Sequence, residues 1–347
     1  MQPAHNNNKS ILLIYTGGTI GMVKDLGTGL LKPLDFDHLI NQIPELNQFG
    51  FEIHTLTFDP VIDSSEVEPG IWIKLARTIY NHYDEFDGFV ILHGTDTMAY
   101  TASALSFLLQ NLAKPVILTG AQLPIGTLRT DGKENIISSI EIAAGQKEGK
   151  PIIPGVSIYF EYKLLQGNRT TKYSAETFNA FISPNYPILA ECGVHINYNE
   201  DVIHIPSPGH KPVLYEKMAT GVTFLKIYPG ISGEIVRTIL SSKGLEALIL
   251  ETYGAGNAPT GSWLLQPLKT FIENGGLVLN ISQCLVGEVD MGQYETGHTL
   301  KNIGVLGGRD LTREAAITKM MFLLGNFNDP VERKLLLSRS ICGEMNG

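Results

Sequence analysis

Two turns rich in glycine and threonine follow apolar runs in the first third of this chain, in SILLIYTGGTIGM at residues 10–22 and GFVILHGTDTMAY at residues 88–100. Each run of Ile, Val and Leu has the length of a buried strand and stops at or just before glycine. The polar residues that follow the two runs are Thr16, Thr19, Thr95 and Asp96. If the runs are neighbouring parallel strands, these side chains lie at the carboxyl edge of the sheet, where open α/β sheets bind ligands.

The rest of the chain alternates short apolar runs with longer amphipathic segments, which is typical of a mostly parallel α/β sheet. We expect strands at 11–15, 51–58, 88–92, 115–119 and 156–160, and helices at 69–83, 101–111 and 131–144. After PSPGHKP at 206–212 the pattern restarts, with strands at 224–228, 247–252 and 277–282 and helices at 233–242 and 263–274. A length of 347 residues exceeds the usual size of one hydrophobic core. We therefore expect an N-terminal domain at 1–205, a linker at 206–222 and a C-terminal domain at 223–347.

Charge and composition favour a small molecule as the ligand. The formal net charge is −9, the pI is near 5.5 and no basic stripe is visible, which argues against nucleic acid or an anionic membrane as the main partner. Hydrophobic residues make up 43% of the chain and charged residues only 18%. This low surface charge leaves room for subunit interfaces, so we expect an oligomer.

The cysteines and the N-terminal residues indicate the compartment. Cys192, Cys284 and Cys342 are odd in number and far apart, which suits a reducing environment and provides no metal-binding spacing. The first ten residues, MQPAHNNNKS, read neither as a signal peptide nor as a membrane anchor. We expect a cytoplasmic protein that needs no metal.

Each of these motifs, taken singly, can be interpreted either as catalytic or as an ordinary structural feature. TGGTIG matches neither of the glycine motifs that bind nucleotides, so its glycines can instead expose a threonine nucleophile beside oxyanion-binding amides. It can equally be a tight turn whose threonine caps a helix. HGTDT supplies an acid that can bind an amino group or orient a base, or that caps the following helix. In GNRTTK at 167–172, Lys172 can act as a base or be an ordinary solvated lysine.

Together the motifs resemble those of the bacterial asparaginase family, and specifically its cytoplasmic type I branch. The resemblance runs from about Ser10 to about Glu344. It is carried by IYTGGTIGM, DSSE at 63–66, GFVILHGTDTMAYTASALSF, TGAQLP at 119–124, GNRTTK and YGAGNAP at 253–259. The recurrence of all these motifs in this order makes the resemblance very specific.

The resemblance implies a hydrolase that converts L-asparagine to L-aspartate and ammonia through an acyl-threonine, without cofactor or metal. Thr19 matches the nucleophile, and Thr95, Asp96 and Lys172 match a second catalytic set that moves the proton. Asp96 also matches the partner of the substrate ammonium. The remaining matched substrate contacts are Asp63, Ser64 and Ser65 at the α-carboxylate, Gly94 in the second turn, and Ala121 near the amide. Thr16 is expected to be structural.

The resemblance also implies an assembly. Family members have a larger N-terminal and a smaller C-terminal α/β domain and form dimers or tetramers, in which Asn257 of YGAGNAP would reach the neighbouring subunit's site. Two departures stand out. The loop at 23–34 lacks the tyrosine that many members carry, so Leu30 or a neighbour occupies that region. Glu251 stands where type I members carry an arginine for an asparagine effector, although Ser282, Gln283 and Cys284 fit the rest of that site.

Two other functions stay open at this point. An asparaginase-like amidase subunit of a tRNA-dependent amidotransferase would release ammonia for a partner, but it is expected to carry an additional domain before TGGT. A non-catalytic amino-acid sensor could use the same fold. The joint presence of Thr19, Thr95, Asp96 and Lys172 argues against a sensor.

Overall fold

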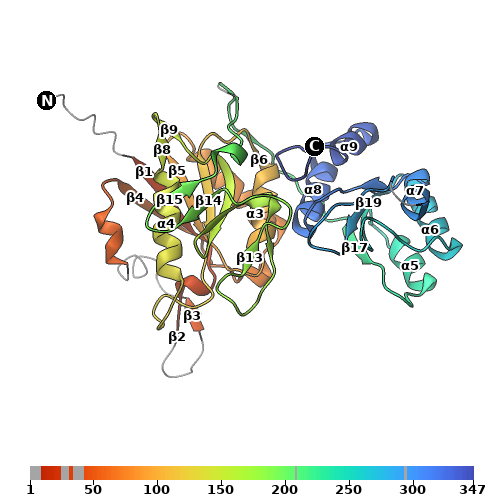
Figure 1. The fold of residues 1–347 in the computed structure, drawn as a ribbon, viewed down its shortest axis with the longest axis horizontal. Coiled ribbons are helices and arrows are strands. Elements are labelled where there is room, and N and C mark those ends of the chain that lie inside the picture. The colour runs from red at the N-terminus through yellow and green to blue at the C-terminus, as the bar shows by residue number, and fades with distance from the viewer. Residues whose placement is uncertain (1–8, 25–30, 34–42, 208, 293–294) are drawn as a thin grey trace. The chain divides into compact units, whose positions relative to one another are not determined.

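The computed structural model describes residues 9–24, 31–33, 43–207, 209–292 and 295–347. Contacts within the chain divide it into two compact units, shown in Figure 1. The first consists of Met1–Ser183 and Pro187–Leu214, and the second of Pro184–Tyr186 and Tyr215–Gly347. Both combine a sheet with helices, so the predicted α/β class is confirmed. Within the described residues, no helix is long and apolar enough to cross a membrane.

The first unit is built on an eight-stranded sheet in the order β15-β14-β11-β10-β7-β5-β1-β4. Its strands are β1 (Ser10–Tyr15), β4 (Glu52–Thr57), β5 (Gly88–Leu92), β7 (Pro115–Thr119), β10 (Gly155–Phe160), β11 (Lys163–Gln166), β14 (Ala190–Cys192) and β15 (Ile196–Tyr198). The strands from β4 to β10 are parallel, and β1 pairs directly with β5. The prediction that the two glycine-threonine runs are neighbouring parallel strands is therefore confirmed.

The remaining strands of this sheet are antiparallel, which the sequence analysis did not anticipate. β10 and β11 form a hairpin whose two turn residues, Glu161 and Tyr162, have φ values of 47° and 65°. Such a turn is usually signalled by Asn-Gly or a similar pair, because residues other than glycine, asparagine and aspartate rarely adopt positive φ. Glu-Tyr gives no such signal, so the hairpin was not visible in the sequence.

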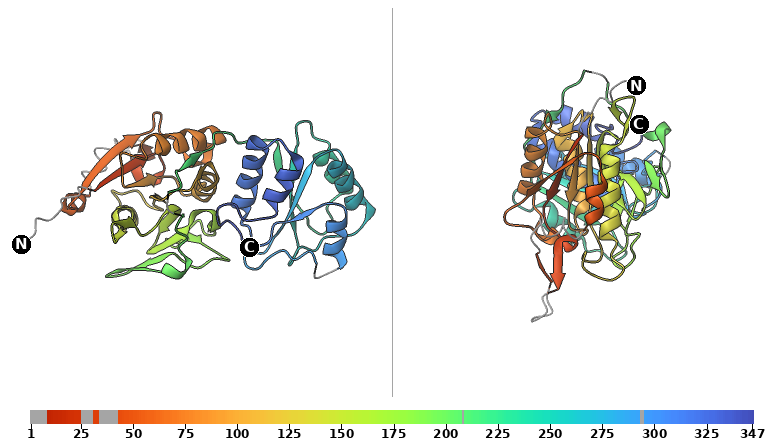
Figure 2. Two further views of the ribbon diagram at one scale, coloured as in Figure 1. Left: turned by 90° about the horizontal axis from the view of Figure 1, so that it is seen from above. Right: turned by 90° about the vertical axis from the view of Figure 1, so that its left-hand side faces the viewer.

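Helices lie on both faces of the first sheet, as Figure 2 shows. They are α2 (Pro69–Asn81), α3 (Met98–Leu108) and α4 (Gly132–Ala144). α4 contacts β1, β5, β7 and β10, and α3 contacts β7 and β10. The expected helix at 101–111 begins and ends three residues earlier, because Leu109–Gln110 forms β6 and pairs with β16 (Val213–Leu214).

Short elements complete the first unit. They are η1 (Thr19–Gly21), β2 (Met22–Lys24), β3 (Leu31–Pro33), η2 (Pro44–Gln48), η3 (Ser64–Glu66), β8 (Gln146–Lys147), β9 (Lys150–Pro151), η4 (Gly167–Arg169), β12 (Thr171–Lys172), β13 (Phe181–Ile182) and η5 (Glu200–Val202). Several of them carry the polar motifs noted in the sequence. η1 follows β1, η3 contains the last three residues of DSSE, and β12 ends at Lys172.

The second unit has a four-stranded parallel sheet of β17 (Val222–Lys226), β18 (Ala247–Thr252), β19 (Leu277–Ser282) and β20 (Leu306–Gly307). Its helices are α5 (Gly233–Leu240), α6 (Ser262–Glu273), α7 (Glu295–Asn302), α8 (Arg313–Asn326) and α9 (Pro330–Leu337). Figure 2 shows α8 and α9 on one side of this sheet and α5 and α6 on the other. Apolar side chains of β17, β18, α5 and α6 form a core between them, including Leu225, Val236, Leu250 and Leu268.

A buried ion pair fixes the C-terminal residues to α8. Lys319 Nζ lies 2.7 Å from Glu344 Oε1, and both side chains are fully buried. The same ammonium donates to the carbonyl of Arg339, while the carboxylate accepts from the backbone N–H groups of Ile341 and Cys342. Because removal of one partner leaves an uncompensated buried charge, it typically costs about 3–5 kcal/mol.

Candidate active site

Two glycines bring the predicted catalytic turns into contact. β1 and β5 are paired in register, with Tyr15 opposite Leu92, so both chains leave the sheet at the same edge. Gly18 has φ 92°, and a Cβ atom built on it would lie 2.5 Å from both the Cα and the N of Gly94. A residue with a Cβ atom at position 18 could not approach the Gly94 backbone so closely. Thr19 and Thr95 each follow one of these glycines directly.

The DSSE segment joins the same contact. A Cβ atom on Gly94 would lie 2.5 Å from Ser64 Oγ, so this predicted substrate residue packs directly against the second turn. Ser64 is buried, and its carbonyl accepts a 2.7 Å hydrogen bond from Thr97 Oγ1. Asp63 accepts hydrogen bonds from both the backbone N–H and the hydroxyl of Ser65, each at 2.9 Å. These bonds, the backbone one above all, lower the pKa of Asp63.

Lys172 joins Thr95 and Asp96 into one polar cluster. Its ammonium donates to Thr95 Oγ1 and to Asp96 Oδ1, both at 2.8 Å. The Lys172 side chain is 16% exposed and that of Asp96 is 69% exposed. The lysine is therefore inside the cluster and the acid faces solvent, which is a suitable position for a carboxylate that binds an incoming cation.

The two threonines of TGGT have different surroundings. Thr16 is buried, and its hydroxyl donates to the carbonyl of Leu92 at 2.9 Å, so its proton is committed to the neighbouring strand. Thr19 is half-buried and opens η1, whose Gly21 N–H bonds back to the Gly18 carbonyl. Within the described part of the chain, no side-chain hydrogen bond holds the Thr19 hydroxyl. Of the two, Thr19 has the hydroxyl that is available to a ligand.

A third loop, at the end of β7, closes on Thr95. Ala121 is 2% exposed, and the neighbouring Gln122 accepts a 3.3 Å hydrogen bond from Thr95 Oγ1. The amide of Gln122 donates in turn to the carbonyl of Thr177, in the loop that follows Lys172. Ala121 was predicted from its motif to contact the substrate, whereas no role was predicted for Gln122. Its place beside Ala121 at the carboxyl end of a parallel strand was the available signal.

His93 is a second residue that the sequence analysis did not single out. It is 1% exposed, and its Nδ1 lies 2.7 Å from the carbonyl of Gly94, to which only an N–H can donate. Its Nε2 therefore accepts from Thr101 Oγ1 at 3.0 Å, and that oxygen accepts from Trp72 Nε1 at 3.0 Å. Burial lowers the pKa of His93 to about 4, so the ring is neutral. It holds the second turn through its hydrogen bond to the Gly94 carbonyl.

Asn257 belongs to the second unit. Its backbone forms a bridge with Tyr253, and its Oδ1 accepts a 2.7 Å hydrogen bond from Thr296 Oγ1. Leu30, named for the loop that lacks a tyrosine, lies outside the described residues. Within the described ranges, no group of His, Cys, Asp and Glu side chains is arranged to hold a metal ion.

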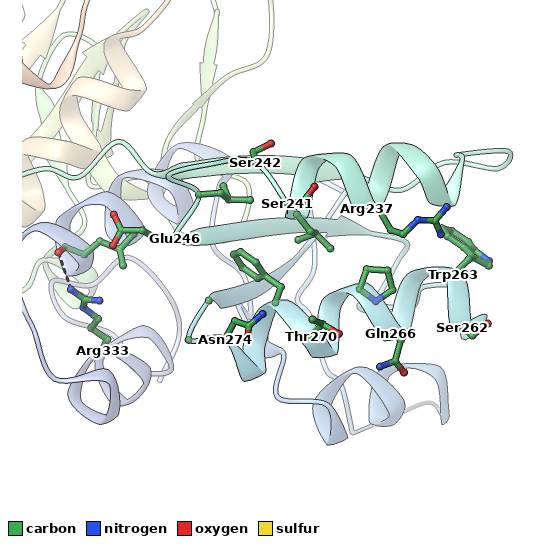
Figure 3. Close-up of a pocket in the computed structure, with 17 residues that line it drawn as sticks. Arg237, Ser241, Ser242, Glu246, Ser262, Trp263, Gln266, Thr270, Asn274 and Arg333 are labelled. Atoms are coloured by element: carbon green, nitrogen blue, oxygen red, sulfur yellow. Dashed lines mark hydrogen bonds between the residues drawn. The ribbon is translucent and has the colours of Figure 1, made fainter.

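A groove in the second unit offers a contrast to this cluster. It has a volume of about 1210 Å³ and lies along α5 and α6, with Arg237 beside Trp263 near one end and Arg333 at the other (Figure 3). Its hydroxyl groups include Ser241 and Ser242, which both donate to the helix carbonyl of Thr238. None of the predicted catalytic residues lines it. The groove is therefore separate from the candidate site.

Comparison with known proteins gives one consistent result. The family model described as "Asparaginase, N-terminal" matches residues 10–204, and "Glutaminase/Asparaginase C-terminal domain" matches residues 221–337. L-asparaginase 1 of Escherichia coli (strain K12) is 42% identical over 346 residues, which cover 97% of this chain and 98% of that protein. The crystal structure of L-asparaginase I from Vibrio cholerae superposes with a TM-score of 0.88 at 39% identity, covering 97% of this chain and 99% of that one.

A more distant relative represents the amidotransferases. A glutamyl-tRNA(Gln) amidotransferase subunit from Methanobrevibacter smithii is 32% identical over 349 residues, which are 99% of this chain and 78% of that protein. The match thus leaves about a fifth of that protein without a counterpart here. With both of its halves matched by the models of one family, and with Lys172 bonded to Thr95 and Asp96, the chain belongs to the asparaginase family.

Proposed function

We propose that this protein hydrolyses L-asparagine to L-aspartate and ammonia through a covalent acyl-threonine. One observation carries the proposal: Lys172 bonds to both Thr95 and Asp96. These two residues follow Gly94, and Gly94 contacts Gly18, the residue before Thr19. This arrangement supplies a hydroxyl, a proton-transfer pair and a carboxylate at one edge of the sheet. Together with membership of the asparaginase family, it supports an amino-acid amide as the substrate.

In the proposed reaction the oxygen of Thr19 attacks the side-chain amide carbon and forms an ester. The Thr19 hydroxyl gives up its proton to the set formed by Thr95 and Lys172, and the departing nitrogen gains one from the same set, so that it leaves as ammonia and the set ends with the protons it began with. Water then attacks the ester, releases L-aspartate and restores the Thr19 hydroxyl. Backbone N–H groups of the glycine turns are proposed to stabilise the negative oxygen, and loss of one such donor typically costs about 10²–10³ in rate.

The same cluster accounts for recognition of a zwitterion. The exposed carboxylate of Asp96 is proposed to bind the substrate ammonium. Ser64, together with Ser65 and the Asp63 carboxylate that holds Ser65, is proposed to bind the α-carboxylate. Ala121 would contact the amide group through its backbone. Fixing both ends of the substrate positions its amide over the nucleophile, and this removes much of the entropic barrier.

The proposal extends to assembly and location. We infer that protomers associate as dimers or tetramers and that Asn257 completes the site of a neighbouring subunit. A chain with only 18% charged residues has a surface suited to such interfaces. A cytoplasmic location is proposed because the three cysteines are widely separated and form no disulfide in the structure. No cofactor is needed for the proposed chemistry.

Ammonia release tests the proposal directly. The purified protein is incubated with L-asparagine, L-glutamine or D-asparagine, without any tRNA or partner protein, and ammonia is measured over time. An asparaginase releases ammonia from L-asparagine fastest under these conditions. An amidotransferase component would show strong stimulation by its partner and charged tRNA, whereas a sensor would bind the amino acid and release none.

A further inference from the structure

The start of α4 carries an aspartate that does not cap its own helix. Asp131 occupies the N-cap position of α4, where a carboxylate normally accepts from the N–H groups of the first helical turn. Here its side chain makes no capping hydrogen bond. The hydroxyl oxygen of Thr130 accepts from the Gly132 N–H at 3.0 Å instead. The carboxylate of Asp131 is therefore available for another role.

That carboxylate holds the loop that follows β7. The backbone N–H of Gln122 donates to both of its oxygens, at 3.1 and 3.0 Å, and the N–H of Leu123 donates to Oδ1 at 3.1 Å. Thr130 adds a bond from its hydroxyl to the carbonyl of Leu123 at 3.0 Å. A charged acceptor satisfies two adjacent backbone donors at once, so the orientation of this turn is strongly fixed.

Asn135, one helical turn later, fixes the other end of the same loop. Its Nδ2 donates to the carbonyl of Gly120 at 2.9 Å and to Asp131 Oδ2 at 3.3 Å. Its Oδ1 accepts from the N–H of Glu161 at 3.2 Å, and the whole residue is 1% exposed. Side chains at the start of α4 thus hold residues 120–123 by hydrogen bonds on both sides of Ala121.

The loop held in this way touches the second catalytic turn. A Cβ atom on Gly120 would lie 2.4 Å from the His93 carbonyl, and Gln122 Oε1 accepts the hydrogen bond from Thr95. On the other side, a Cβ atom on Gly132 would lie 3.2 Å from Ala121 Cβ and 3.3 Å from a side-chain carbon of Ile20, the residue after Thr19. A shift of the loop would therefore move Gln122, the hydrogen-bond partner of the Thr95 hydroxyl.

We propose that Asp131 is a positioning residue of the reaction, which acts by holding the Gly120–Leu123 turn so that Gln122 orients the Thr95 hydroxyl. Lys172 donates to Thr95 Oγ1, so the threonine's own proton points to Gln122, and the pair fixes both directions of that hydroxyl. The inference rests on the proposed hydrolysis, because it assigns Asp131 to the turnover of that same site. The hydrogen bonds of Asp131 go to the turn and to Asn135 rather than to the reacting groups.

Three variants test this assignment. Asp131→Asn keeps the shape of the side chain but turns one acceptor oxygen into a donor, and Asp131→Ala removes the grip. We expect kcat for L-asparagine to fall about 10-fold in the first and about 10²-fold in the second, with KM changed much less, because misplacement of about 1 Å costs that much. Asp329→Ala is the matched control, since Asp329 is an N-cap aspartate that does cap its own helix, through the Val331 N–H.

The controls separate positioning from stability. Asp329→Ala is expected to lower the melting temperature and to keep the wild-type kcat when assayed well below that temperature. Wild-type kcat in folded Asp131→Asn, or a loss of kcat in Asp329→Ala equal to that in Asp131→Asn, would overturn the assignment. Absence of ammonia release by the wild-type protein would instead overturn the proposed function on which the assignment rests.

Discussion

Gly18 and Gly94 lie in backbone contact although they follow different strands of the first sheet. Gly94 in turn packs against Ser64, so three loops meet at positions where two residues lack a side chain. The polar groups of the candidate site are placed by this contact, because Thr19, Thr95 and Ser64 are all within one residue of it. The spacing between the loops is thus set by the absence of Cβ atoms.

Alanine at position 18 is expected to disrupt this contact. The new Cβ atom would overlap the Gly94 backbone, and φ 92° is strained for any residue with a side chain. We expect kcat/KM to fall by about 10²-fold or more, because the loops must separate. Gly149→Ala is the control: it also has positive φ, 77°, but its Cβ would meet nothing within 4 Å. It should cost about 1 kcal/mol of stability and leave kinetics unchanged, and equal kinetic losses in both variants would contradict this interpretation.

Thr19 is expected to carry the covalent intermediate. Thr19→Ala should fold and bind L-aspartate yet release essentially no ammonia, because removal of a nucleophile abolishes the acyl-enzyme. Mass spectrometry of wild-type enzyme, acid-quenched during turnover of a slow amide, should place the adduct on the peptide that contains Thr19. An adduct on the Thr95 peptide, or substantial activity in Thr19→Ala, would make Thr95 the better candidate.

Replacing Lys172 tests the proton-transfer pair. Lys172→Met keeps most of the side-chain volume but leaves Thr95 and Asp96 without their shared donor. We expect kcat to fall by about 10²–10⁴, the usual range for loss of a proton-transfer group. Lys147→Met is a matched control, because Lys147 forms an exposed ion pair with Glu200 on the same unit. It should retain wild-type turnover, and near wild-type kcat in Lys172→Met would remove Lys172 from the mechanism.

The buried His93 makes stability depend on pH. Its folded pKa of about 4 lies below the ordinary histidine pKa of 6.5, so between these pH values the unfolded chain binds a proton that the folded chain excludes. The contribution of the neutral His93 ring to the free energy of unfolding is therefore fully present above about pH 6.5, and it is lost as the pH falls towards 4. Between pH 7 and pH 5 we expect a loss of about 2 kcal/mol from this residue.

Urea unfolding of wild type and His93→Gln at both pH values measures this contribution. The drop in unfolding free energy from pH 7 to pH 5 should be larger in the wild type by about the stated amount, because glutamine does not titrate. The same drop in both proteins would show that His93 can be protonated without cost in the folded state.

Regulation by asparagine is expected to be absent. Glu251 is 5% exposed and its carboxylate binds the Nε of Arg313 at 2.7 Å, while Gln283 donates to the Glu251 carbonyl. An effector carboxylate would meet this acid and would have to compete with it for the guanidinium. Initial rates against asparagine concentration should therefore be hyperbolic. Clear sigmoidality at constant oligomeric state would show that other residues form an effector site.

The sequence predicted those features that depend on local patterns. Apolar runs located the parallel strands, and β5, β7, β18 and β19 have the predicted bounds. The motif residues Thr95, Asp96 and Lys172 proved to be in contact. Their roles stay a prediction, as do those of Thr19 and Asn257 and the domain bounds.

Two kinds of feature could not be predicted from the sequence. One is a contact between residues far apart in the chain, and the other is the choice between neighbouring side chains for the same hydrogen bond. Asp131 has the sequence appearance of an ordinary N-cap, and only the structure shows that Thr130 takes over the capping. Gln122 becomes relevant only because the loop after β7 folds onto Thr95. The partner of Glu251, Arg313, is 62 residues away, so only the structure shows that this acid is paired with a cation.

The polar cluster depends on contacts that form late in folding. The bond from Lys172 to Thr95 spans 77 residues, and the contacts of Gly94 with Gly18 and Ser64 require β1, β4 and β5 to be in place. Contacts of such long range form after the loops between them have closed. During refolding, catalytic activity would therefore return later than the helical circular dichroism signal. The return of turnover then reports when the first sheet is complete.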